Sequence, residues 1–214
     1  IDPNHPEWED KDGVSRLQQI DWYTESGLSG VQSTNYYRDA DGHGTHCAGI
    51  AAGKTYGWAK GAHIYSQKLA GLETLSGSDG TGTSISDAFD AIRLWHNAKT
   101  NSRPTVVNMS WGYGSDQTTD PISGTYRGAA WTYGVDYTDR GGLWAATGVS
   151  RLFFGNNRVP VRVPSVDAEI EDMIDDGIHV CIAAGNNRYK ADLPTGLDFD
   201  NEVVFSGGTY QYHR

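Results

Sequence analysis

The feature that most constrains this fold is an alternation of short apolar runs with amphipathic helical segments. Residues 105–110 and 178–184 are apolar runs of strand length, and residues 62–70 alternate well enough for a further strand. The segments between them carry apolar residues at helical spacing, namely Ile85, Phe89, Ile92 and Trp95, and then Val166, Ile170, Met173 and Ile174. Near-continuous apolar strands that alternate with helices are typical of a parallel sheet. The sequence therefore predicts an α/β fold.

Local signals place the ends of the predicted helices. A short buried helix is predicted to begin near His43 and to stop at Gly53. Ser84 or Ser86 can cap the helix that follows, because a hydroxyl oxygen accepts a hydrogen bond from the first turn. Gly177 is predicted to end the last helix.

Residues 113–160 do not follow this alternation, because they are aromatic and Gly-rich with weak periodicity. A stretch of this length without regular structure is uncommon inside a compact domain. We predict one domain over residues 1–214 with an insertion at about 113–160. The aromatic side chains of the insertion suit a cover over a cleft or a partner surface, and equally suit packing against the domain's own flank.

The composition argues against some classes of function. The formal net charge is −10, which argues against nucleic acid as the main partner, because phosphate binding needs clustered Lys and Arg. No run reaches the roughly 18 apolar residues of a membrane span, so no membrane partner is predicted. The cysteines Cys47 and Cys181 are too few for a disulfide framework and lie in apolar runs, so we predict buried, inert thiols.

Residues 41–49 carry the strongest chemical signal in the chain. The pair His43 and His46 could ligate a metal, but a zinc site would need a third and a fourth ligand. A general base is the better interpretation of His43, because Gly42 and Gly44 would leave room beside it for a nucleophile and a substrate backbone. We predict that His46 is a buried, hydrogen-bonded histidine. From these residues alone, a purely structural role for His43 stays open.

The sequence His-Gly-Thr-His-Cys-Ala-Gly at residues 43–49 resembles the active-site histidine motif of the subtilisin-like serine proteases, the subtilases. The resemblance continues in the family's order along most of the chain outside the insertion. Residues 1–8 resemble the segment that follows the catalytic aspartate, and residues 58–70 resemble the stretch that follows the histidine motif. Residues 79–82 resemble the substrate-edge segment and residues 108–112 the pocket segment. Residues 180–186 resemble the strand that ends in the oxyanion-hole asparagine. The resemblance implies a three-layer subtilisin-like parallel sheet with helices on both faces, here incomplete at both ends.

The resemblance also implies a role for individual residues. His43 would be the general base and then the general acid, and Asn186 would donate its side-chain amide to the oxyanion. The substrate-binding residues would be Ser110, Trp111 and Gly112 on one wall of the pocket, Ala183, Ala184 and Gly185 on the other, and Gly80, Thr81 and Gly82, whose backbone would pair with an extended peptide. A turn role for Asn186 and plain strand packing for the walls are the structural alternatives.

Two members of the expected catalytic triad are not found in the sequence. The nucleophile should lie in Gly-Thr-Ser-Met-Ala well after Asn186, and no such motif occurs there. Ser84 lies in a similar motif, but in the family the serine comes last, so a helix cap is the better interpretation. The catalytic aspartate should precede Ile1, and Asp2 aligns three residues too late. We therefore expect the 214 residues alone to be inactive.

Two further departures concern the surroundings of His43. Asp39 and Asp41 lie too near it in the sequence to be the family's aspartate, and we interpret Asp41 as a turn residue. Many subtilases have a calcium loop between the positions of Gly53 and Gly57, but here the connection is short, so no calcium is expected there. No cofactor or catalytic metal is predicted, and a structural calcium elsewhere stays open.

The sequence thus predicts part of a serine endopeptidase that acts on polypeptide substrates. The alternative is a catalytically dead subtilase-like module with a binding or structural role. The truncated chain is expected to self-associate through sheet edges and apolar surface that remain exposed. By analogy with the family, the resemblance favours an extracellular or virion-associated location.

Overall fold

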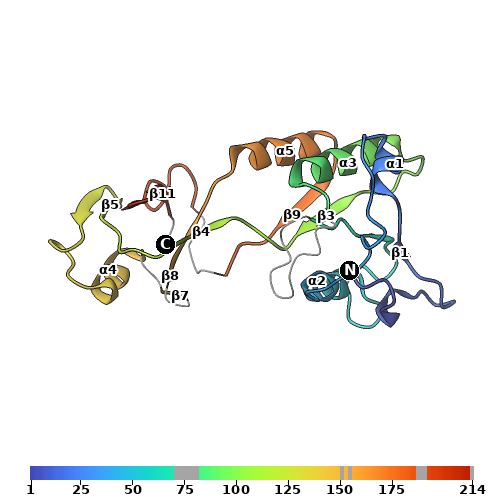
Figure 1. Cartoon of the computed structure of the whole chain (residues 1–214), viewed down its shortest axis with the longest axis horizontal. Helices are drawn as coiled ribbons and strands as arrows, with labels where there is room; N and C mark the ends of the chain where they lie inside the picture. Colours follow the sequence, from blue (N-terminus) through green and yellow to red (C-terminus); the bar gives the residue numbers. More distant parts are fainter. Residues whose placement is uncertain (70–81, 150–151, 154–155, 187–191, 213–214) are drawn as a thin grey trace. The chain divides into compact units, whose positions relative to one another are not determined.

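The computed structural model describes residues 1–69, 82–149, 152–153, 156–186 and 192–212 (Figure 1). The chain folds as two compact units. The first unit comprises residues 1–107 and 168–180, and the second comprises residues 108–167 and 181–214.

The first unit combines helices with short parallel strands, as expected for an α/β fold. Its helical elements are η1 (Pro6–Trp8), α1 (Trp22–Ser26), α2 (His43–Ala52), α3 (Ile85–Ala98) and the greater part of α5 (Pro164–Asp175). Strands β1 (Leu17–Gln18) and β2 (Ile64–Tyr65) pair in parallel. Strands β3 (Val106–Met109) and β9 (His179–Ile182) form a second pair, whose first half belongs to this unit and whose second half belongs to the second unit. This pair is also parallel, because the amides of His179 and Ala183 donate to the carbonyls of Thr105 and Met109 in the same order, each over 3.0 Å.

The predicted helix ends are confirmed. α2 begins at His43 and ends immediately before Gly53. The Ser84 hydroxyl accepts a hydrogen bond from the Asp87 amide over 3.2 Å and so caps α3. α5 ends before Gly177, whose φ of +83° is left-handed. The strand predicted over residues 62–70 is shorter, since β2 holds only two residues.

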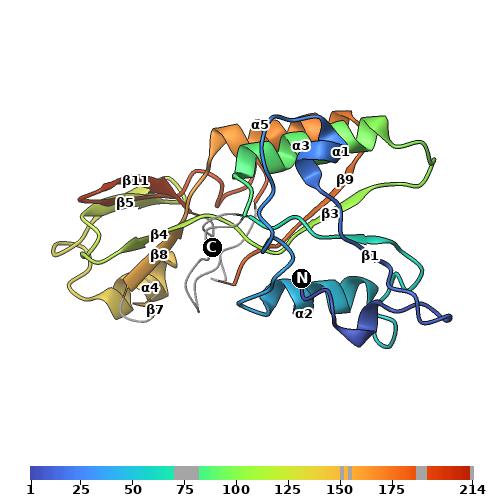
Figure 2. The same ribbon diagram turned by 45° about the vertical axis from the view of Figure 1, so that its right-hand side comes forward.

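The helices α3 and α5 lie side by side, and α2 lies on the other side of strands β1 and β3 in both views (Figures 1 and 2). Arg93 of α3 joins the two neighbouring helices. Its guanidinium donates to Asp176 over 2.8 Å and to Asp172 over 2.9 Å. The Arg93 hydrogen bond keeps the pKa of the Asp176 carboxyl below its ordinary value. This pairing fixes α3 against the end of α5, from which β9 follows.

The core of the first unit fixes α2 to the parallel strands. It is formed by Trp8, Leu17, Ala52 and Ile64. Beside it, the buried Arg16 guanidinium donates to three backbone carbonyls, those of Ala52, Ala62 and Glu7, over 2.7, 3.0 and 3.1 Å. The carbonyl of Ala52 is the last of α2, so a cation there satisfies a free helix terminus.

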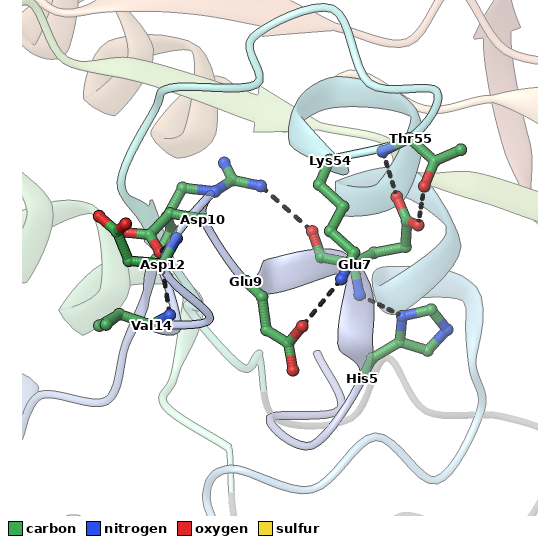
Figure 3. Close-up of polar contacts among 9 residues, drawn as sticks. His5, Glu7, Glu9, Asp10, Asp12, Val14, Lys54 and Thr55 are labelled. Atoms are coloured by element: carbon green, nitrogen blue, oxygen red, sulfur yellow. Dashed lines mark hydrogen bonds and ion pairs between the residues drawn. The ribbon is translucent and has the colours of Figure 1, made fainter.

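Side chains of the N-terminal segment bind the connection that follows α2 (Figure 3). The Glu7 carboxylate accepts hydrogen bonds from the Thr55 hydroxyl and from the Thr55 amide, the latter over 2.8 Å. These two bonds lower the pKa of Glu7, the hydroxyl contributing most. Lys54 pairs with Glu9 over 2.8 Å. Within the described residues, no three His, Cys, Asp or Glu side chains are grouped to hold a metal ion.

The second unit consists mainly of antiparallel sheets. One sheet has the order β11 (Gly208–Gln211), β10 (Glu202–Phe205), β5 (Ser123–Tyr126) and β6 (Ala129–Thr132), and the other has the order β4 (Gly114–Gln117), β8 (Asn156–Pro160) and β7 (Leu152–Phe153). Helix α4 (Arg140–Thr147) follows β6. The core is formed by Trp131, Leu143, Val149, Val159, Val203, Phe205 and Tyr212.

The segment 113–160 is therefore not irregular, and that expectation was wrong. It supplies β4 to β8 and α4, and β5 pairs with β10, whose residues come more than 70 positions later, as in Val203 with Gly124. Its aromatic Trp131 packs in the core. None of the helices in the described part of the chain has the length and hydropathy needed to cross a bilayer.

The pair β3–β9 is more exposed than its apolar sequence predicts. Met109 is buried, but Val106 is 61% exposed and Ile182 is 58% exposed. Apolar runs of this kind predict buried strands, and that prediction is wrong for Val106 and Ile182. Each of these two apolar side chains is left uncovered by the described residues.

Candidate active site

His43 lies at the first position of α2, with its side chain exposed. The N-cap residue before it is Gly42, with a φ of +85°, a conformation that only glycine adopts without strain. Gly44 has no such constraint, because a Cβ there would meet only ordinary contacts, the nearest being Asp39 at 3.7 Å. Of the two glycines predicted to leave room beside His43, only Gly42 is required by the backbone.

A carboxylate from outside the helix supplies the cap that Gly42 lacks. Asp39 accepts hydrogen bonds from the Gly42 amide over 2.7 Å and from the Thr45 amide over 2.8 Å, and a third from the Thr45 hydroxyl. Sequence reasoning missed this role, because an N-cap side chain is expected at the position immediately before the helix. The signal that could have found it is an aspartate a few residues before a glycine N-cap.

The capping carboxylate makes the stability of this region depend on pH. Partial burial opposes ionisation of Asp39, but the hydrogen bonds from Thr45 and Gly42 outweigh it and lower the pKa of the carboxyl. A carboxyl whose pKa is lower in the folded than in the unfolded state stabilises the fold above about pH 4, the ordinary pKa of an aspartate in the unfolded chain. This stabilisation is lost as the pH falls through the pKa of the folded state.

We expect Asp39→Ala to lower the unfolding free energy by about 1 kcal/mol at pH 6, the typical cost of removing a helix cap. At pH 2 to 3 the difference from the original chain should shrink, because the protonated carboxyl has lost part of its advantage. Urea denaturation at both pH values measures this. An equal difference at the two pH values would contradict the assignment of Asp39 as an ionised cap.

The two thiols differ in their surroundings. The Cys47 sulfur lies 3.7 Å from Nε2 and 4.0 Å from Nδ1 of His43, and its side chain is half-buried. Cys181 of β9 is exposed, so the prediction of two buried thiols was wrong for this residue. A thiol at the surface is open to reagents.

We expect Cys181 to react with an aromatic disulfide reagent before Cys47 does in the folded chain, because accessibility limits the rate at a half-buried thiol. Absorbance of the released thiolate would follow two phases. Cys181→Ser should remove the fast phase, with Cys47→Ser as the matched control that keeps it. If Cys47→Ser removed the fast phase instead, Cys47 would be the more accessible thiol, which would contradict the exposure of Cys181.

The two predicted pocket walls lie next to each other in the second unit. Residues 110–112 follow β3 and residues 183–185 follow β9. The Ala183 amide donates to the Met109 carbonyl over 3.0 Å, which holds the two segments together where they leave the strands. In open α/β sheets, ligands bind outside the carboxyl ends of parallel strands. The structure thus brings both predicted walls to a position suited to binding.

The side chains at this position are largely open to solvent. Asn186 is exposed, as are Ala183, Ala184 and Gly185. The Ser110 hydroxyl accepts a hydrogen bond from the side-chain amide of Asn108 over 2.9 Å. Trp111 contacts Tyr113 edge to face, with ring centroids 5.7 Å apart. An exposed side-chain amide beside exposed backbone can donate to a bound carbonyl oxygen.

The remaining predicted site residues fall elsewhere. Gly82 is half-buried in the first unit. The backbone amide of the next residue, Thr83, donates to the Lys68 carbonyl over 2.8 Å. Gly80 and Thr81 lie outside the described residues. His46 is exposed, so the prediction of a buried histidine was wrong. The functional roles of all these positions stay predictions.

Comparison with known proteins points to one family. Residues 1–204 match the family model described as "Subtilase family". Over 176 residues the chain is 28% identical to the subtilisin-like serine protease Cla h 9.0101 of Davidiella tassiana, a match that covers 82% of this chain and 26% of that protein. It is 34% identical over 162 residues to the subtilisin-like proteinase Spm1 of Pyricularia oryzae, with 72% and 21% covered.

A shorter match has higher identity. The subtilisin-like serine protease Cur l 4.0101 of Cochliobolus lunatus is 39% identical over 89 residues, which cover 38% of this chain and 17% of that protein. The chain thus spans about a quarter or less of the length of these relatives. No solved structure gives a significant match.

Proposed function

Because the chain belongs to the subtilase family, we propose that it is part of a serine endopeptidase that cleaves extended polypeptides. The observation that carries the proposal is the adjacency of residues 110–112 and 183–186 beyond the carboxyl ends of two parallel strands. A peptide laid along these exposed backbone segments would be bound by strand addition. The presence of His43 at an exposed helix start in the first unit supports the same proposal.

In the proposed reaction, His43 takes a proton from a serine hydroxyl as the serine attacks the peptide carbonyl, and then returns it to the leaving amine. An acyl-enzyme forms and water hydrolyses it. Asn186 donates its side-chain amide to the oxyanion that develops on the substrate carbonyl. Ser110 to Gly112 and Ala183 to Gly185 line the pocket, and Gly80 to Gly82 pair with the substrate backbone.

We propose that the serine and the catalytic aspartate come from further chain, and that the 214 residues alone are inactive. The exposed apolar surface supports this. After its first turn, helix α2 holds only small or apolar residues, from Cys47 to Ala52, yet only Ala52 is buried and Ile50 is 54% exposed. A helical segment that is apolar on all sides is normally covered on all sides. Further chain over α2 and over the exposed Val106 and Ile182 would complete a three-layer fold.

We further propose that, without a cover, the 214-residue chain self-associates at high concentration, because exposed apolar side chains promote contact between copies. An extracellular location rests on analogy with the family alone.

The experiment that tests the proposed function uses a serine-directed fluorophosphonate probe. The 214-residue chain and a longer product of the same gene, extended in both directions, would be labelled side by side. We expect labelling of the longer protein only, its loss in His43→Ala, and a decrease in kcat of about 10²–10³-fold in Asn186→Ala, the usual cost of one oxyanion donor. A longer protein that is never labelled would instead support the catalytically dead module.

A further inference from the structure

We propose that Asp39 is a positioning residue for His43. It fixes the start of α2 relative to the N-terminal segment, which by the family resemblance follows the catalytic aspartate. The catalytic importance of this position for His43 rests on the proposed function. Its geometry does not depend on that function, because every contact it uses lies in the first unit.

Asp39 holds the first turn of α2 through both oxygens of its carboxylate. One carboxylate oxygen accepts from the Gly42 amide over 2.7 Å, directly before His43. The other accepts from the Thr45 amide over 2.8 Å and from the Thr45 hydroxyl. His43 lies between the two residues that this carboxylate binds. Its backbone is therefore fixed on both sides by one side chain.

Thr45 connects this carboxylate to the N-terminal segment. The Thr45 hydroxyl, which donates to Asp39, also accepts from the Asp2 amide over 2.7 Å. The Asp2 carbonyl accepts from the buried Trp8 indole over 2.6 Å. The backbone amide and the carbonyl of Asp2 are thus both hydrogen-bonded, and the amide is connected through Thr45 to Asp39. By the family resemblance, residues 1–8 come directly after the catalytic aspartate, so this network would set the separation between aspartate and histidine.

A second capping aspartate distinguishes positioning of His43 from ordinary helix capping. Asp21 caps α1 in the same unit, and its carboxylate accepts from the Thr24 amide over 3.0 Å. That bond is local to α1 and involves neither His43 nor Asp2. Asp21→Ala is therefore a matched control, since it removes a helix-capping aspartate without touching the network around His43.

The experiment compares Asp39→Ala, Asp39→Asn, Thr45→Val and Asp21→Ala in the 214-residue chain. The readouts are thermal stability and NMR signals of the His43 ring and the Asp2 amide, with the ring signal assigned through His43→Ala. We expect Asp39→Ala to shift or broaden both signals beyond the line width, and Asp39→Asn to restore part of the original positions. Thr45→Val should move the Asp2 amide. Asp21→Ala should lower stability and leave both signals in place.

Unchanged His43 and Asp2 signals in folded Asp39→Ala would overturn the proposal, as would equal shifts in Asp21→Ala. If Asp39→Ala does not fold, Asp39→Asn and Thr45→Val decide by the same criteria. In the longer protein, Asp39→Ala should lower kcat by about 10-fold or more with little change in KM, because a small misplacement of a catalytic group slows the reaction. A shifted His43 signal in a longer protein that no serine probe labels would refute the proposed function and leave the positioning role standing.

Discussion

Replacing Trp8 with alanine should destabilise the first unit by about 3–5 kcal/mol, the range for removing a buried aromatic side chain. Trp8 is only 1% exposed and packs with Leu17, Ala52 and Ile64, so the cavity would open where α2 meets the parallel strands. The substitution also removes the indole that donates to the Asp2 carbonyl. Because small domains unfold at a cost of about 5–15 kcal/mol, this is a large part of the total.

The measurement is urea denaturation followed by circular dichroism, with Trp58→Ala as the matched control. Trp58 lies in the same unit and is 92% exposed, so its replacement should change the unfolding free energy by no more than about 0.5 kcal/mol. Similar losses in the two variants would mean that Trp8 does not occupy the core between α2 and the parallel strands.

Leu143→Ala should destabilise the second unit by about 2–5 kcal/mol, the range for truncating a buried leucine. Leu143 of α4 is completely buried and packs in the cluster that includes Val203 and Phe205 of β10. The loss would show that the segment 113–160 shares a core with the C-terminal strands. Fluorescence-detected denaturation can measure it, because Trp131 lies in the same cluster.

Leu197→Ala is the control for this second substitution. Leu197 belongs to the same unit and is 76% exposed, so its truncation should have an effect within about 0.5 kcal/mol. If Leu143→Ala were as mild as the control, α4 would not be packed in the core, and residues 113–160 would be an independent appendage.

The helices were predictable because their signals are local. Glycine at residue 53 and residue 177, and the hydroxyl of Ser84, act within one turn of the helix that they end or begin. The spacing of apolar residues in α3 also identified its buried side, where Phe89 and Ile92 lie. Signals of this kind do not depend on the rest of the chain.

The second unit was not predictable in the same way, because the pairing that joins its hairpins is not local. β5 pairs with the next strand β6 and β10 with the next strand β11, and only the pairing of β5 with β10 across the intervening sequence joins them in one sheet. Glycine and polar residues in these short strands weaken the alternation on which sequence analysis depends. The exposure of Val106 and Ile182 was equally hidden, since an apolar residue does not reveal whether another segment covers it.

For the candidate site, motifs in the sequence pointed to His43 and to the two predicted pocket segments, whose roles stay predictions. The structure added the contacts that no motif encodes. Asp39 reaches α2 from three residues before the N-cap, and Thr45 carries that contact on to Asp2. Such a network depends on how a loop folds back, which neither residue type nor spacing specifies.

The three carbonyls around Arg16 restrict which substitutions evolution can accept at this position. They come from residues 7, 52 and 62, three separate parts of the chain. A lysine would keep the positive charge, but its single nitrogen lacks the planar fork that spans separated acceptors. At least one of the three carbonyls would then lose its hydrogen bond from this side chain. Relatives that carry lysine here should therefore show compensating changes at the end of α2, and arginine at this position should vary together with those residues.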